Sequence, residues 1–439
     1  MTKTTNSTKA KPESNDVDAT TSGGDYAILG LLTFINILNF VDRQLLASFA
    51  NFIVPDLELS NTQFGLLTGF AFIVFYSVMG LFMGALADRL HRPRLLAFGL
   101  AMWSILTAAS GAAKGFTSLL LPRMLIGIGE SAATPTAMSW LADRFPSSKL
   151  GFAAGCYYLG VPIGVAVSLL VAGYLGPAIG WRNCFYFLGA IGVAVALLLL
   201  FVPETKRKGV HNETKVPFNF RQTLRDLRAA LSASPALVAT IAGGVAFHFI
   251  LGAAAFDQLW MVQERGFERA EIAVLSGWLA AGGGLIGTLA GGLMSDWWQK
   301  HFSSGRPMFL FWTSLILLPA AIAYRIVPAD HVFFNIGIFL GFLQLGLFYG
   351  PTFSTVQELA PARIRGTIVA FYILMLNLVG LGIGITGGGI LVDYFISIEH
   401  AQPYTITLLI FTAVSAAAIP CMYYAGHHFH RDLERNVQS

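Results

Sequence analysis

The sequence has few charged residues and almost no cysteine. Only 12% of its 439 residues are Asp, Glu, Lys or Arg, and 55% are hydrophobic, whereas an ordinary soluble domain carries roughly 25% charged residues. The charges gather in short segments between long apolar stretches, as repeated membrane spans require. The composition therefore excludes an ordinary soluble protein, and the 46 glycines fit helices whose backbones approach closely in lipid.

Several kinds of functional motif are missing. Cys156, Cys184 and Cys421 lie in or beside apolar segments, so we expect them to be packing residues and to form no disulfide framework or metal site. The sequence has no phosphate-binding G-x-x-x-x-G-K-[ST] loop, no His or Cys pair at metal spacing and no nucleophile elbow. We therefore expect no enzyme, no cofactor and no metal. The net charge of +4 sits at loop ends and does not predict a nucleic-acid partner.

Apolar runs of about twenty residues predict an all-α membrane protein with twelve transmembrane helices. The predicted spans lie near 26–50, 61–86, 95–113, 117–142, 150–175, 183–203, 235–263, 271–294, 307–327, 331–357, 365–393 and 402–425. The predicted domains are a disordered cytoplasmic tail (1–25), an N-terminal six-helix bundle (26–203), a cytoplasmic linker (204–234), a C-terminal six-helix bundle (235–425) and a second cytoplasmic tail (426–439). The first tail has no apolar core of a signal peptide.

Lys and Arg are shared unequally between the two sides of the predicted membrane. The side that would hold both termini and the linker carries 21 of the 28, and the opposite loops carry five. The positive-inside rule therefore predicts that both termini are cytoplasmic. The short loops are typical of a bacterial protein, so we expect the chain in the inner membrane of a bacterium. We also expect it to be a monomer.

Two short patterns occur once in each predicted bundle. The segment Gly84 to Asp88 ends the second span as Gly292 to Asp296 ends the eighth. A second pattern, from Pro146 to Gly151, recurs between spans ten and eleven with a basic residue again just before the glycine. The two recurrences predict an internal duplication into pseudo-symmetric halves, the architecture expected for alternating access.

Ionisable residues in the middle of predicted spans are the main functional candidates, because each costs several kcal/mol in lipid. Asp42 and Arg43 lie in the first span and Glu130 in the fourth. At helical spacing, Asn39 joins Arg43 and Arg123 joins Glu130 on polar stripes, which we expect to face each other or a water-filled cavity.

Burial and a nearby arginine act on a carboxyl group in opposite directions. A carboxyl that gains and loses an arginine partner during a conformational change would therefore take up and release a proton. Our hypothesis makes Asp42 the principal proton carrier, Arg43 its partner and Glu130 a second carboxyl that competes for the same arginine. The alternative is a static ion-pair network that holds the first and fourth helices together.

The segment Gly84 to Arg94 reads Gly-Ala-Leu-Ala-Asp-Arg-Leu-His-Arg-Pro-Arg. It resembles the cytoplasmic loop signature of the major facilitator superfamily, with His91 where that family usually has glycine. The resemblance implies the major facilitator fold and a latch that joins the two halves on the cytoplasmic side in the outward-open state. The residues that it assigns to this cytoplasmic gate are Gly84, Asp88, Arg89, Arg92 and Asp296.

Further motifs resemble the spinster-like branch of that superfamily. They are Asn-Phe-Val-Asp42-Arg43-Gln, Ser60-Asn-Thr-Gln63-Phe-Gly, Arg123 to Ser131 with its Gly-Glu130, Gly160-Val-Pro-Ile-Gly164 and Gly180-Trp-Arg-Asn-Cys-Phe. The resemblance implies transport of an amphiphilic lipid, such as a lysophospholipid or a sphingoid phosphate, coupled to protons through Asp42, Arg43 and Glu130. The residues that we expect at the substrate cavity are Asn39, Arg123, Tyr157, Tyr158, His248, Tyr349 and Asn377.

Other readings stay open at this point. His248 is equally consistent with a hydrogen bond across helices that never titrates. A multidrug or organic-anion facilitator would share the same fold. A channel or membrane receptor is a third possibility, but two six-helix repeats with matching loops favour rocking about a central site. The expected partners are an amphiphilic substrate, protons and membrane lipids.

Overall fold

The protein is a bundle of long helices, as the apolar runs predict. A computed structural model describes residues 21–87, 89–205 and 220–438, and helices are the only regular elements in those ranges. The first group of helices comprises α1 (Gly23–Ser48), α2 (Ala50–Asp56), α3 (Asn61–Thr68), α4 (Phe70–Ala87), α5 (Arg92–Gly111), α6 (Phe116–Glu130), α7 (Ala133–Arg144), α8 (Ser147–Tyr158), α9 (Gly160–Leu170), the π-helical η1 (Val171–Leu175), α10 (Gly176–Ile179) and α11 (Trp181–Leu199).

The amphipathic α12 (Phe220–Ala233) separates this group from a second one. The second group comprises α13 (Pro235–Ala253), the 3-10 turn η2 (Ala254–Phe256), α14 (Asp257–Gln263), α15 (Arg269–His301), α16 (Gly305–Ala323), α17 (Val332–Leu359), the 3-10 turn η3 (Ala362–Ile364), α18 (Arg365–Met375), the π-helical η4 (Leu376–Gly382), α19 (Ile383–Ser397), α20 (Pro403–Ser415) and α21 (Ala418–Gln438). We refer to α1–α11 as the N half and to α13–α21 as the C half.

Eleven of the predicted spans appear, in the described part of the chain, as helices long and apolar enough to cross a membrane by length and composition. The fourth predicted span is helical too, but it is divided into α6 and α7 by a turn at Ser131 and Ala132. Neither piece reaches the length of a full span. The break comes directly after Glu130, so it falls at one of the residues singled out from the sequence.

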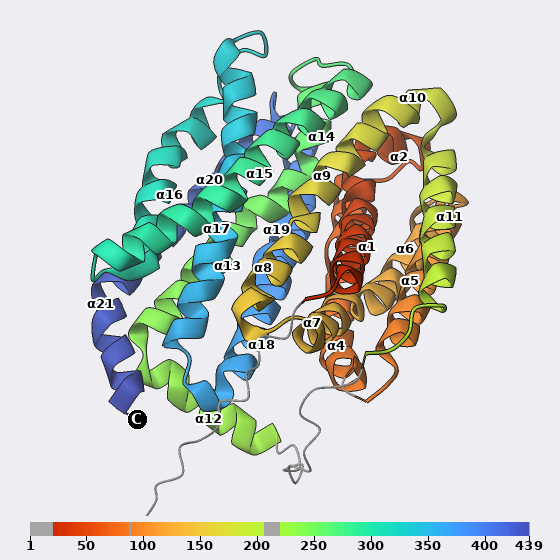
Figure 1. Cartoon of the computed structure of the whole chain (residues 1–439). Helices are drawn as coiled ribbons and strands as arrows, with labels where there is room; N and C mark the ends of the chain where they lie inside the picture. Colours follow the sequence, from red (N-terminus) through yellow and green to blue (C-terminus); the bar gives the residue numbers. More distant parts are fainter. Residues whose placement is uncertain (1–20, 88, 206–219, 439) are drawn as a thin grey trace, which may run out of the picture.

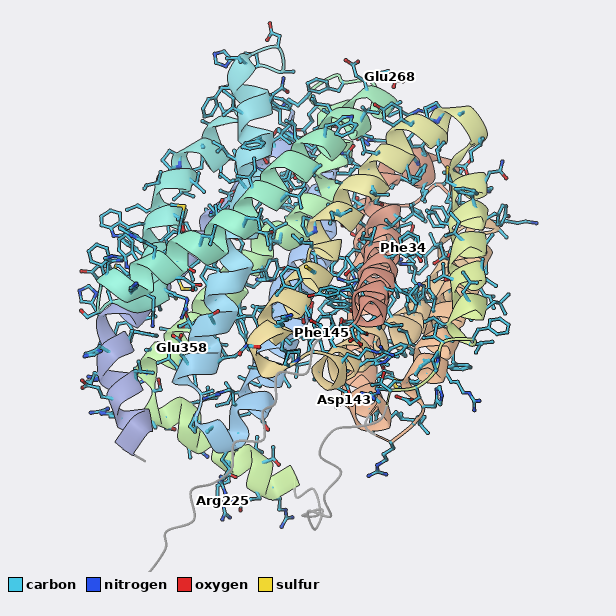
Figure 2. All side chains as sticks on the ribbon, in the orientation of Figure 1. Phe34, Asp143, Phe145, Arg225, Glu268 and Glu358 are labelled. Carbon is cyan, nitrogen blue, oxygen red and sulfur yellow. The ribbon has the colours of Figure 1, made fainter. Side chains whose placement is uncertain are left out.

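The ends of the helices define two sides of the molecule (Figure 1). One side carries α12 and the end of α21, and we call it the linker side. The opposite side carries α2, α10 and α14, and we call it the far side. Figure 2 shows Glu268 at the far side, and Arg225 and Asp143 toward the linker side.

Glycines set how closely the helices pack within each half. Gly283, Gly287 and Gly291 of α15 face α17, and a Cβ placed on Gly287 would lie 2.3 Å from the Leu343 carbonyl oxygen. The three glycines form a close-packing surface, in line with the close approach of helix backbones that the glycine content predicts. Without side chains at these positions, the two backbones approach to a distance that no other residue permits.

The two halves meet on the far side. Helices α9 and α15 pack along each other, as do α3 and α19. Asn51 donates a hydrogen bond to the Gln258 carbonyl oxygen at 2.7 Å, and the Arg269 guanidinium lies 4.4 Å from the centre of the Phe52 ring. Among the described residues, every hydrogen bond, ring contact and cation–π contact between the halves lies toward the far side. The structure is therefore closed on the far side.

Candidate functional site

The polar stripe of the first helix lies in the protein core. Asn36, Asn39 and Asp42 on α1 are all buried among apolar side chains. A buried polar group costs free energy unless it is hydrogen-bonded, and a buried charge costs more unless it is paired. The partners of these side chains on neighbouring helices therefore decide what the stripe does.

Arg43 pairs with Glu130. Its Nε and Nη2 atoms both donate to Oε2 of Glu130, at 3.2 and 3.1 Å. The Glu130 side chain is fully buried, whereas 23% of the Arg43 side chain stays exposed. The guanidinium lies 4.9, 5.0 and 4.4 Å from the centres of the Phe40, Phe72 and Tyr76 rings. The arginine thus has one buried anionic partner, three aromatic neighbours and a solvent-accessible part.

Asp42 points toward α5 instead. Its carboxyl lies beside the Trp103 indole and the Thr107 hydroxyl, and neither of those groups has another hydrogen-bond partner. Arg123 and Glu130 are its charged neighbours, but no ion pair to Asp42 occurs in the described ranges. In this conformation Arg43, the neighbour of Asp42 in the sequence, is therefore bound to Glu130 and not to Asp42.

Arg123 links the site to a break in the second helix. Its Nε donates to the Leu67 carbonyl oxygen at 3.3 Å, and its guanidinium lies 5.3 Å from the centre of the Phe72 ring. The irregular backbone at Gly69 divides α3 from α4, which leaves carbonyl groups near the break without a helical partner. Phe72 consequently contacts both arginines of the network.

Two polar atoms beside the ion pair lack a well-formed hydrogen bond, although the Asn39 and Glu130 side chains are close enough to interact. They are Oε1 of Glu130 and Nδ2 of Asn39, and Asn39 lies next to Glu130. Buried polar atoms are nearly always hydrogen-bonded in native proteins. Weakly bonded groups around an ion pair fit a network that has a second arrangement of its partners.

The fifth helix supplies the predicted tyrosines. Asn36 donates to the Tyr157 carbonyl oxygen at 2.8 Å, and the Tyr157 hydroxyl lies 3.3 Å from Oγ1 of Thr134. Tyr157 is fully buried, whereas Tyr158 is 45% exposed. Tyr157 therefore connects the first, fourth and fifth helices, and the Tyr158 ring packs edge to face on the Tyr157 ring with their centres 5.3 Å apart.

The C half contributes a histidine and a tyrosine. The Nδ1 atom of His248 lies 2.7 Å from the Gly244 carbonyl oxygen, and Nε2 lies 3.0 Å from the Tyr349 hydroxyl. This contact joins α13 to α17, as the cross-helix reading of His248 predicts. Tyr349 is close enough to Arg43 to feel its charge, so this pair faces the N-half network. Within the described part of the chain, the one hydrogen bond of the Asn377 side chain in η4 goes to the Ile373 carbonyl oxygen of α18, at 3.1 Å.

The described residues of the predicted cytoplasmic gate lie on the linker side. Asp88 is outside the described residues, Arg89 is exposed, and a Cβ on Gly84 would meet nothing within 4 Å. Asp296 accepts hydrogen bonds from Arg306 of its own half at 2.8 and 3.1 Å. Among the described residues of this group, no contact reaches the other half, as expected of a latch that is released while the far side is closed.

Arg92 has a role that sequence analysis missed. It is fully buried and donates to Glu204 at 2.7 Å and to Asp143 at 2.6 Å. It also donates to the Ser139 and Thr205 carbonyl oxygens, at 2.9 and 3.0 Å. These partners come from distant positions, so no local pattern in the sequence could reveal that the arginine fastens the start of the linker to α7.

A second buried ion pair was also missed. Arg325 donates to Oδ1 of Asp257 at 3.1 Å and lies 5.4 and 4.8 Å from the centres of the Trp260 and Tyr324 rings. The count of Lys and Arg takes Arg325, at the end of the ninth predicted span, as an ordinary far-side cation. The pair belongs to the far-side end of the C half and has no contact with Asp42, Arg43 or Glu130.

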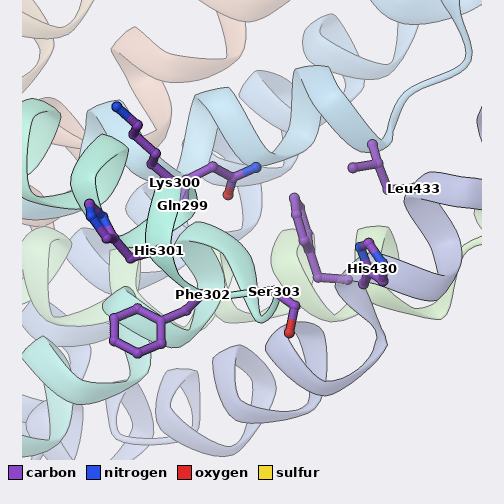
Figure 3. A pocket seen from close by; sticks show the side chains of 8 residues that line it. Gln299, Lys300, His301, Phe302, Ser303, His430 and Leu433 are labelled. Atoms are coloured by element: carbon purple, nitrogen blue, oxygen red, sulfur yellow. The ribbon is translucent and has the colours of Figure 1, made fainter.

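A surface pocket on the linker side of the C half lies apart from this network (Figure 3). It is lined by Gln299, Lys300, His301, Phe302, Ser303, Phe429, His430 and Leu433. None of the residues predicted to couple protons or to contact substrate belongs to it.

Comparison with known proteins matches this chain to a protein family. The Major Facilitator Superfamily model matches residues 32–385. An "MFS-type efflux pump" of Mycolicibacterium smegmatis is 28% identical over 431 residues, which cover 93% of this chain and 94% of that protein. A "probable sphingolipid transporter spinster homolog 2" of Arabidopsis thaliana is 22% identical over 440 residues, with coverage of 93% and 89%.

A solved structure is similar over nearly the whole length. It is the crystal structure of a bacterial homolog to the human lysosomal transporter Spinster, in an inward-facing and occupied conformation. The TM-score is 0.77, the sequence identity is 25%, and the match covers 93% of this chain and 98% of that one. These similarities confirm the predicted resemblance to spinster-like transporters.

Proposed function

The chain belongs to the major facilitator superfamily, and from this membership we propose that it is a proton-coupled secondary active transporter of an amphiphilic, lipid-like substrate. The family and its structural neighbours are transporters and not enzymes. In this proposal the protein works by alternating access in the inner membrane of a bacterium, as a monomer with both termini cytoplasmic.

The observation that carries the proposal is the network of two carboxyls and two arginines between the first and fourth helices. Arg43 holds Glu130 at 3.1 Å, while Asp42 and Arg123 lie beside this pair. With every member ionised the four charges sum to zero. One added proton gives the network a net charge of +1, which would attract an anionic head group and couple the two events.

Proton transfer in this proposal follows the partner of Arg43. While Arg43 holds Glu130, Asp42 is the carboxyl without an ion pair to Arg43. After a switch of Arg43 to Asp42, Glu130 would be the carboxyl without that ion pair. The carboxyl that lacks the arginine carries the proton, because an isolated charge is costly in the protein interior. The partial exposure of Arg43 supports such a switch, since the side chain is not packed on every side.

The surroundings of Arg43 also support an amphiphilic substrate. The guanidinium is a suitable partner for a phosphate or carboxylate, and the adjacent Phe40, Phe72 and Tyr76 rings offer apolar surface. We propose a lysophospholipid or sphingoid phosphate, in line with the sphingolipid named for the Arabidopsis relative. The proposed substrate contacts are Asn39, Arg123, Tyr157, Tyr158, His248, Tyr349 and Asn377.

The test is uptake into proteoliposomes with an imposed pH gradient. Labelled lysolipids, sphingoid phosphates and small organic anions are screened with the wild-type protein and with Asp42→Asn and Glu130→Gln. Each variant should lose gradient-driven accumulation, because it removes a carboxyl that gains and loses the proton. Exchange of substrate at equal pH should persist, because the variants keep a polar side chain of similar shape.

Asp330→Asn is the matched control, since it neutralises an exposed acid on the far side. It should leave accumulation unchanged. Accumulation that stays normal in both Asp42→Asn and Glu130→Gln would contradict proton coupling through this network and favour a static role for the ion pair.

A second candidate is an efflux pump for small amphipathic compounds or organic anions. It is favoured by the efflux pump of M. smegmatis, which matches this chain over nearly all of both lengths. The same proteoliposome screen separates the two candidates, because a pump of this kind would move organic anions or drugs and leave lysolipids behind.

A further inference from the structure

A carboxylate of the C half binds the start of a helix in the N half. Oδ1 of Asp393, near the end of α19, accepts hydrogen bonds from the Asn61 backbone nitrogen at 3.1 Å and from its side-chain amide at 2.9 Å. Oδ2 accepts one from the Thr62 backbone nitrogen at 2.8 Å. All three contacts cross between the halves on the far side.

The beginning of α3 needs such an acceptor. The first backbone N–H groups of a helix have no partner within the helix and carry partial positive charge. Ser60 satisfies one of them, because its hydroxyl accepts from the Gln63 nitrogen at 3.1 Å. The N–H groups of Asn61 and Thr62 remain, and Asp393 takes both. Hydrogen bonds to an ionised acceptor are roughly twice as strong as neutral ones.

Two further residues shape the contact. The Tyr404 hydroxyl on α20 donates to Oδ1 of Asn61 at 2.8 Å. Gly389, one helical turn before Asp393, lies so close to α3 that a Cβ on it would be 2.2 Å from the Asn61 carbonyl oxygen. The helices can approach this closely only with glycine at that position.

We propose a far-side latch that holds α3 of the N half to α19 and α20 of the C half. It is formed by Asn61, Thr62, Gly389, Asp393 and Tyr404. The latch is closed in this structure and must open before substrate reaches the site from the far side. It lies at the opposite end of the second helix from the linker-side signature at Gly84 to Arg92. One helix therefore carries a latch at each end, and the two latches alternate.

The proposal rests on alternating access and not on proton coupling or on the identity of the substrate. It is tested without substrate and without a pH gradient, by distances between nitroxide labels on a protein whose three cysteines are replaced. One label pair sits at Lys114 and Asp330 on the far side. A second pair sits at Ser148 and Ala362 on the linker side, and all four positions are exposed.

Asp393→Ala and Gly389→Ala should both add a population with a longer far-side distance and a shorter linker-side distance. The first variant removes the acceptor, and the second blocks the approach of the helices. Asp393→Asn should give a smaller shift, because it keeps one acceptor oxygen. Tyr404→Phe removes a single hydrogen bond and should likewise shift the populations only in part.

Gly387→Ala is the matched control, because a Cβ there would make only an ordinary contact with Phe411 at 3.4 Å. It should leave both distances unchanged. Distances that stay at their wild-type values in both Asp393→Ala and Gly389→Ala would overturn the latch, and so would an equal shift in Gly387→Ala. A failure of proton-driven uptake with normal latch behaviour would count against the proposed transport mechanism alone.

Discussion

Arg92 is fully buried, although its motif predicts a role in a latch at the molecular surface. Its guanidinium binds two carboxylates and two backbone carbonyl oxygens that belong to α7 and to the start of the linker. An arginine offers five donors in a fixed planar arrangement, which suits such a junction. The contacts of Arg92 therefore favour a role in the stability of the N half, besides the gating role that its motif predicts.

Replacing Arg92 should lower stability. Arg92→Ala removes a fully buried arginine that binds Asp143 and Glu204, which we expect to cost about 3 kcal/mol. The apparent Tm of the purified protein in detergent should fall clearly. Arg94→Ala removes an exposed arginine two residues away and should have little effect. An unchanged Tm for Arg92→Ala would mean that the junction contributes no net stability.

Arg43, in the network with Asp42, Arg123 and Glu130, differs from Arg92 in its exposure and in its number of carboxylate partners. Arg43 keeps 23% of its side chain exposed and binds one carboxylate, whereas Arg92 binds two and has no exposed surface. A buried arginine bound to two carboxylates is held in one position, whereas a partly exposed arginine bound to one carboxylate is freer to change its anionic partner. This difference separates the two arginines more clearly than their sequence motifs do.

At the scale of elements, irregular backbone gathers around the network. The second helix is interrupted at Gly69, the fourth after Glu130 and the fifth at Leu159. Interruptions expose carbonyl and N–H groups that side chains can use, as Arg123 uses the Leu67 carbonyl oxygen. The regular helices at the periphery hold these interrupted segments in place.

The packing of α15 against α17 provides a test at this scale. In Gly287→Ala the new Cβ would lie 2.3 Å from the Leu343 carbonyl oxygen, so the two helices must move apart. Overpacking of this kind typically costs about 1–3 kcal/mol, and the apparent Tm should fall.

Gly292→Ala is the control for that change, because a Cβ there would meet nothing within 4 Å. It should leave the Tm unchanged or raise it slightly, since alanine is the better helix former. Equal Tm values for the two variants would show that close contact between α15 and α17 is not needed.

At the scale of the whole molecule, the structure is closed on the far side, and the described residues of the linker-side signature make no contact with the opposite half. The latch at Asp393 and the contacts between α9 and α15 account for the closed side. On the linker side, Arg306 pairs with Asp296 and Glu358 inside the C half. Asp296, which the resemblance assigns to the cytoplasmic gate, is thus paired within its own half in this structure.

Orientation in the membrane gives the third prediction. The excess of Lys and Arg on the linker side predicts that this side is cytoplasmic. Green fluorescent protein fused to the C-terminus should fluoresce, and alkaline phosphatase fused there should be inactive. Alkaline phosphatase inserted at Asp330, in a far-side loop, should be active. The reverse pattern would require the opposite orientation and would exchange the two latches.

The sequence by itself determined the membrane class, the all-helical architecture, the superfamily and the candidate residues. Apolar runs and the placement of charges are local properties, and charged groups within spans are conspicuous because lipid penalises them. Only the tertiary structure decided which of these groups are partners. Arg43 with Glu130, Arg325 with Asp257 and Asp393 with the start of α3 join positions 68 to 332 residues apart. Such pairings depend on how helices pack, and no local pattern encodes them.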